Sequence, residues 1–318
     1  MEACYSQQQF NVTSYAATAV AVVTFEAFAG MWINAFIVSV ICMTWVRKRT
    51  LNSYEKILLT VGCSRFCFLC FSWVYVFLLI IYPNYFHVHP TLQLLSSAQS
   101  FFTCSNFWVS ACLCVFYCIK IANFRNSFFI YLKLKIDRIV PWLLLGSALF
   151  SLVNGILVYD FTNKPHCNNS TRQGHFWKVK IKTDEHFFTF YVIIGFVYAT
   201  PFTAVIFSAL LLLFSLWRHR CNMQTTSMKD LSMDAHIKAM KSIISFFVMY
   251  SINIIALIVG MIYSTKEENP IMLMTYVFMC AFPGLHSLIL IFSNPSLETT
   301  LLRILTCVKC TVCMTQEL

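Results

Sequence analysis

The sequence predicts an all-α membrane protein, a seven-transmembrane helix bundle with a short amphipathic eighth helix. The chain of 318 residues is 58% hydrophobic, has a mean hydropathy of +0.69 and carries only 11% charged residues, whereas soluble proteins usually carry about 25%. Long apolar runs recur along the chain, and the basic residues gather in the segments between them. That arrangement is typical of loops at a membrane face rather than of a nucleic-acid-binding surface.

Seven apolar runs are each long enough to cross the hydrocarbon layer, which takes about 20 helical residues. Helices are expected because lipid cannot satisfy free backbone groups. The runs cover residues 16–45, 57–82, 92–119, 139–159, 186–217, 242–264 and 271–293. We therefore expect an N-terminal segment over 1–15, a seven-helix domain over 16–293, and a surface helix with a tail over 294–318.

The distribution of Lys and Arg predicts the orientation. Sixteen of these residues lie in segments on the side of the C-terminus, and six lie on the other side. Because cytoplasmic loops carry the excess of positive charge, we expect an extracellular N-terminus and a cytoplasmic C-terminus in the plasma membrane. The sequons at Asn11, Asn168 and Asn169 all fall on the predicted outer side, where glycosylation occurs.

The last segment predicts a helix on the inner membrane surface. Asn294 suits an N-cap and Pro295 a first helical position. Leucines then recur at helical spacing over 297–305, as in an amphipathic interfacial helix. Three cysteines at 307, 310 and 313 lack the His or fourth Cys of a zinc site. They are candidates for palmitoylation or remain unmodified thiols.

Arg65 is the most informative single residue, because it falls in the middle of the second run. An arginine there costs on the order of 3 kcal/mol and should face the bundle with a partner. Glu26 and Asn34 in the first run are the expected partners, with Ser287 behind them. Two interpretations stay open: a static polar clamp, or a network that differs between resting and active states.

Three polar residues near the outer end of the third run, Gln99, Ser100 and Thr103, are spaced to face one cavity. A pocket there would be apolar with a few hydrogen-bonding groups and no carboxylate, which favours small neutral ligands. Enzyme classes are disfavoured, because no Gly-rich phosphate loop, no Ser/His/Asp set and no metal-ligand spacing is found. We expect no cofactor and no metal.

Motifs in chain order then suggest a family. The third run ends in Phe116-Tyr117 followed by Lys120-Ile121-Ala122-Asn123-Phe124, and the seventh carries His286-Ser287 and Leu288-Ile289-Leu290-Ile291 before Asn294-Pro295. Over nearly the whole chain this set resembles the bitter taste receptors, the type 2 taste receptors, which are G protein-coupled receptors. Gln99 and Thr103 depart from the Trp and Asn common in that family.

The resemblance implies a receptor that binds small bitter agonists and activates a gustducin- or Gi-type heterotrimeric G protein, with a dimer possible. Facing pocket positions inferred from the family are Phe190, Ile194, Asn253, Tyr276 and Met279. The residues expected at the G protein socket are Tyr117, Lys120, Asn123, His219 and His236. For Lys120, simple snorkelling to the interface is the other interpretation.

Two alternatives remain at this stage. One is a vomeronasal type-1-like chemosensory receptor. The other is a seven-span transporter, which should show internal repeats and broken helices; the sequence contains no repeat.

Overall fold

The computed structural model describes residues 14–82, 85, 88–122, 124, 126–163, 185–223, 231–263 and 270–316. The regular structure within these ranges is helical, and seven of the eight helices are long and apolar enough to span a membrane. The predicted fold class is therefore confirmed. The helices are α1 (Ser14–Lys48), α2 (Ser53–Ile81), α4 (Thr91–Ile121), α5 (Ser127–Asn163), α6 (Glu185–Met223), α7 (Leu231–Tyr263), α8 (Pro270–Ser293) and α9 (Pro295–Gln316).

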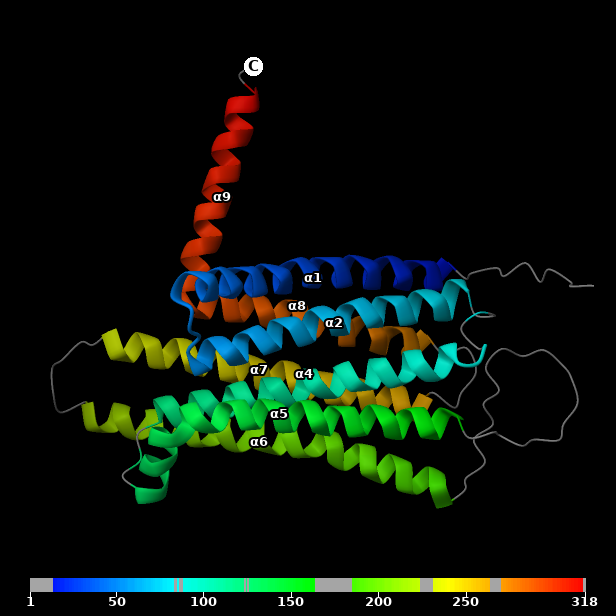
Figure 1. Cartoon of the computed structure of the whole chain (residues 1–318), viewed down its shortest axis with the longest axis horizontal. Coiled ribbons are helices and arrows are strands. Elements are labelled where there is room, and N and C mark those ends of the chain that lie inside the picture. The colour runs from blue at the N-terminus through cyan, green and yellow to red at the C-terminus, as the bar shows by residue number, and fades with distance from the viewer. Residues whose placement is uncertain are drawn as a thin grey trace, which may run out of the picture.

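The seven long helices lie side by side, and α9 leaves the bundle at a steep angle (Figure 1). Helix α4 is central, because it contacts α2, α5, α6 and α7. Helix α1 packs against α2 and α8. We call the end where α2 and α5 begin and where α8 meets α9 the basic end, and the other the opposite end. In Figure 1, α6 and α7 extend farther than α1 and α2 at the basic end.

Several helices extend beyond their apolar runs. Helix α5 begins at Ser127, so Lys133, Lys135 and Arg138, which were expected in a loop, lie on a helix. The Asn126 side chain helps to start α5, because its Oδ1 accepts a hydrogen bond from the Phe128 amide at 2.9 Å. The backbone hydrogen bonds of a helix form within the helix itself. Polar residues can therefore continue a membrane-spanning helix beyond the lipid into water.

The expected helix after the seventh span is present, although at 22 residues it is longer than predicted. Asn294 caps it, since its Oδ1 accepts hydrogen bonds from the amides of Ser296 at 2.9 Å and Leu297 at 3.4 Å. The Leu297 side chain is buried and anchors α9 to the bundle.

Two glycines bring α1 and α8 into close contact. A Cβ added to Gly284 would lie 3.3 Å from the Gly30 Cα, so neither backbone could approach as closely with a larger residue. Asn34 follows Gly30 by one turn, and Ser287 follows Gly284 by one turn. The close approach therefore places these two polar side chains together.

Candidate functional site

The centre of the bundle holds Arg65, which is 0% exposed. Its Nε donates to Asn106 Oδ1 at 3.2 Å, and its Nη1 donates to Ser287 Oγ at 2.8 Å. Its Nη2 lies 2.9 Å from Ser110 Oγ and also contacts His286 Nδ1. We call Arg65 and these four residues, together with Asn34, the Arg65 cluster.

Neutral groups hold this guanidinium. Within the described ranges, no carboxylate forms an ion pair with Arg65. Because a guanidinium can only donate, His286 Nδ1 must accept, and this assigns the imidazole proton to Nε2. A buried charge held by four acceptors from α4 and α8 is sensitive to any change in how these helices sit against α2.

The structure brings three of the four predicted network residues together. Ser287 accepts from Arg65 and donates to Asn34 Oδ1 at 2.8 Å, so Asn34 joins through Ser287. Glu26 is not part of the cluster, and its buried Oε2 has no hydrogen-bond partner among the described residues. It precedes Asn34 by eight residues, about 12 Å along the helix, and therefore lies at another depth.

Aromatic rings connect the Arg65 cluster to α6 and α7. The His286 ring lies 4.7 Å from Phe246, between ring centroids, and stacks on Phe282 at 6.0 Å. Phe107 lies 4.6 Å from Tyr250, whose hydroxyl donates to the Tyr198 carbonyl at 3.3 Å. Through these rings, α4, α6, α7 and α8 pack together in one core.

Toward the opposite end, Gln99 and Thr103 face α2 and their own helix. Gln99 Nε2 donates to Ser72 Oγ at 2.8 Å, and the Ser72 hydroxyl donates back to Gln99 Oε1 at 3.1 Å. Thr103 Oγ1 donates to the Gln99 carbonyl at 2.7 Å. Ser100 bonds in a different direction, because its Oγ accepts from Asn154 Nδ2 of α5 at 2.7 Å. Gln99 and Ser100 therefore bond to two different helices, α2 and α5, and the Thr103 hydroxyl bonds within α4.

The remaining predicted pocket positions lie on α6, α7 and α8. Ile194 is buried beside Tyr198 in the core shared with Phe107, and Asn253 is 3% exposed. The Tyr276 ring lies 5.9 Å from that of Tyr75 on α2. Met279 is half-buried on α8, and Phe190 lies on α6 with its side chain outside the described residues.

At the basic end, Tyr54 joins three elements. Tyr117 donates its hydroxyl proton to the Tyr54 hydroxyl at 3.1 Å, and Asn294 Nδ2 donates to the same oxygen at 3.2 Å. The start of α2 is thus tied to the end of α4 and to the junction of α8 with α9.

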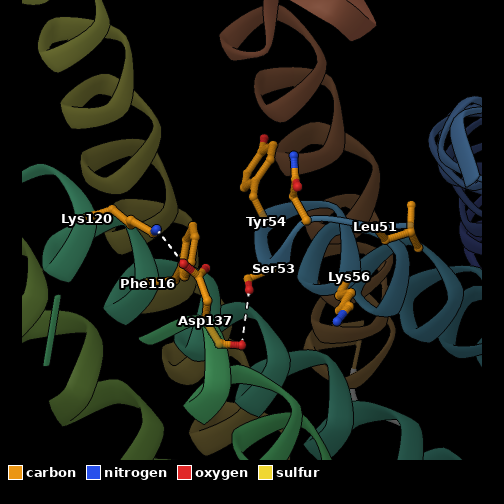
Figure 2. A pocket seen from close by; sticks show the side chains of 8 residues that line it. Leu51, Ser53, Tyr54, Lys56, Phe116, Lys120 and Asp137 are labelled. Atoms are coloured by element: carbon orange, nitrogen blue, oxygen red, sulfur yellow. Dashed lines mark hydrogen bonds and ion pairs between the residues drawn. The ribbon is translucent and has the colours of Figure 1, made fainter. Parts of the chain in front are cut away.

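Lys120, three residues after Tyr117 on α4, forms an ion pair with Asp137 of α5 at 2.9 Å (Figure 2). Ser53 Oγ donates to the Asp137 carbonyl at 3.4 Å. His219 and His236 lie on α6 and α7 with their side chains outside the described residues, and Asn123 is outside them entirely. The sequon residues Asn11, Asn168 and Asn169 are outside them as well.

Sequence reasoning missed Asn106, Ser110 and His286 as partners of Arg65. The first two are polar residues four apart in an apolar helix, which places them on one face. His286 stands next to Ser287, already singled out. The spacing of Asn106 and Ser110 and the position of His286 beside Ser287 are the sequence features from which these partners could have been predicted.

Comparison with known proteins agrees with the fold. A family model described as taste receptor protein (TAS2R) matches residues 12–309. The chain is 32% identical over 289 residues to taste receptor type 2 member 7 of Macaca mulatta, which covers 88% of this chain and 90% of the relative. It is 32% identical over 294 residues to taste receptor type 2 member 9 of Homo sapiens, covering 90% and 92%. The chain therefore belongs to the taste receptor type 2 family, a family of membrane receptors and not of enzymes.

Proposed function

We propose that this protein is a bitter taste receptor of the plasma membrane, which binds small bitter compounds from outside and activates a heterotrimeric G protein inside. The family match over residues 12–309 carries this proposal. In the proposed orientation the basic end faces the cytosol, because its helix ends carry most of the Lys and Arg.

The ligand pocket is proposed between α4, α6, α7 and α8 in the half of the bundle toward the opposite end. Its candidate residues are Gln99, Ser100, Thr103, Phe190, Ile194, Asn253, Tyr276 and Met279. The side chains of Gln99 and Ser100 are hydrogen-bonded to Ser72 of α2 and Asn154 of α5, so a ligand would have to replace these bonds. A ligand that replaced either bond would alter how α4 sits against α2 or α5.

The coupling step is proposed at the basic end, where Tyr117, Lys120, Asn123, His219 and His236 would form the socket for the Gα C-terminus. The Tyr117–Tyr54–Asn294 hydrogen bonds and the Lys120–Asp137 ion pair would hold this end in its resting form. Agonist binding would act by favouring a form in which these contacts differ.

Expression of the full chain in cells carrying a chimeric gustducin Gα tests the proposal. A panel of bitter compounds should include agonists that raise cytosolic calcium in a concentration-dependent way. Cells without the receptor, and receptor-bearing cells without the chimeric Gα, are the controls. A ligand-dependent response that persisted in cells lacking both the chimera and Gi-type subunits would contradict the proposed coupling.

A second part of the proposal concerns the subtype of the G protein. We propose a gustducin- or Gi-type partner on the basis of the family resemblance alone. Loss of the response after pertussis toxin treatment is the expected result in cells that supply only Gi-type subunits. Cross-linking of differently tagged copies at the cell surface would test whether the receptor forms a dimer.

A further inference from the structure

At the basic end, α2, α4 and α5 enclose an open pocket of about 500 Å³ (Figure 2). Its lining residues are Leu51, Asn52, Ser53, Tyr54, Lys56, Phe116, Lys120 and Asp137. We propose that this pocket binds the phosphorylated headgroup of an anionic phospholipid of the cytoplasmic leaflet. The inference goes beyond ligand recognition and coupling, and rests on the proposed orientation of the basic end.

The lining is rich in groups that bind phosphate. Lys56 and Lys120, whose side chains end in ammonium groups, line the pocket together with the polar residues Asn52, Ser53 and Tyr54. Phosphate oxygens accept strong, charge-assisted hydrogen bonds from such donors. The only carboxylate among the lining residues is Asp137, and it is already paired with Lys120 at 2.9 Å. Lys56 is exposed and forms no ion pair within the described ranges.

The surroundings favour a lipid over a soluble phosphate. The described residues of 47–56 and 120–138 contain eight Lys and Arg and two acidic residues. Basic clusters directly beside membrane spans attract anionic lipids of the cytoplasmic leaflet. On α5, just before Asp137, the apolar side chains of Tyr131 and Leu134 are exposed, Leu134 at 77%. They offer a surface for acyl chains next to the headgroup pocket.

Binding would change the contacts at the basic end. A headgroup phosphate between Lys56 and Lys120 would compete with Asp137 for the Lys120 ammonium. Tyr54, in the wall of the same pocket, holds Tyr117 and Asn294. The lipid would therefore act on the contact between α2, α4 and the α8–α9 junction.

Binding of dioctanoyl phosphatidylinositol bisphosphate to the purified full chain in detergent, followed by native mass spectrometry, tests the proposal. We expect this lipid to bind and dioctanoyl phosphatidylcholine not to bind. Lys56→Gln should weaken binding about fivefold, the effect of one lysine near an anionic headgroup. Lys133→Gln, which removes the same charge from an exposed position outside the pocket, is the matched control and should change binding less than about twofold.

Asp137→Asn gives an effect of the opposite sign. It removes the competing carboxylate and frees Lys120, so binding should become tighter, which no general loss of folding would produce. Equal weakening by Lys56→Gln and Lys133→Gln would overturn the pocket and leave only diffuse attraction. Inositol trisphosphate binding as tightly as the lipid would overturn the lipid assignment in favour of a soluble phosphate.

Discussion

At the scale of single residues, the decisive feature is a buried guanidinium without a carboxylate partner in the described ranges. Arg65 depends on each neutral acceptor, because an unpaired buried donor costs the full desolvation penalty. His286→Phe would remove the Nδ1 acceptor and keep a ring between Phe246 and Phe282. We expect a loss of about 1–3 kcal/mol in the free energy of unfolding, seen as a lower thermal midpoint of the purified receptor in detergent.

The matched control for that change is His89→Phe, since His89 is exposed and the hydrogen bond of its Nε2 to Asn163 Oδ1, at 3.1 Å, is exposed as well. Exposed substitutions usually stay within about 0.5 kcal/mol. Equal midpoints for the His286 variant and the unmodified receptor would show that the histidine contact adds nothing to the Arg65 cluster.

The shape of the Arg65 side chain should matter as well as its charge. Arg65→Lys keeps the charge but offers three donors from one point, and these cannot reach acceptors spread over α4 and α8 as a planar fork does. We expect loss of the agonist-dependent calcium response. Cell-surface labelling then separates the two interpretations: normal surface levels favour a state-dependent network, and reduced levels favour a static clamp. Normal labelling with a normal response would exclude both.

At the scale of helices, the contact of Gly30 with Gly284 sets the distance between α1 and α8. Gly284→Ala would place a Cβ 3.3 Å from the Gly30 Cα, and backbone cannot rotate away as a side chain can. Overpacking of this kind costs about 1–3 kcal/mol, and it would also draw Asn34 away from Ser287. A lower thermal midpoint with reduced surface expression is the expected result.

Gly146→Ala is the control for the same chemical change. No heavy atom lies within 4 Å of a Cβ added there, and alanine favours a helix over glycine by about 1 kcal/mol. The midpoint should therefore stay the same or rise. If both variants behaved alike, the α1–α8 approach would not limit stability.

The helices could be predicted from the sequence more fully than the contacts between them. The seven spans and the Asn294 cap followed from local patterns, because hydropathy and capping depend on neighbouring residues. Ser287 was expected behind Asn34, whereas it contacts Arg65 directly and Asn34 lies behind it. Asn106 and Ser110 were not predicted, since the rotation of α4 toward α2 depends on packing. Gln99 and Ser100 were grouped by spacing, but consecutive residues on a helix point about 100° apart, and they bond to different helices.

At the scale of the whole molecule, the charge asymmetry should fix the orientation in the membrane. The segments of the basic end hold sixteen of the Lys and Arg residues and those of the opposite end hold six, and cytoplasmic segments carry that excess. An epitope added after Leu318 should be detected only in permeabilised cells, and one added before Met1 should be detected in intact cells. Asn11→Gln combined with Asn168→Gln and Asn169→Gln should abolish the mobility shift caused by glycosidase treatment, because these sequons lie on the proposed outer side. Labelling of the C-terminal epitope in intact cells would show that the orientation is the reverse of the proposed one. The proposed lipid site and the proposed G protein socket would then not face the cytosol.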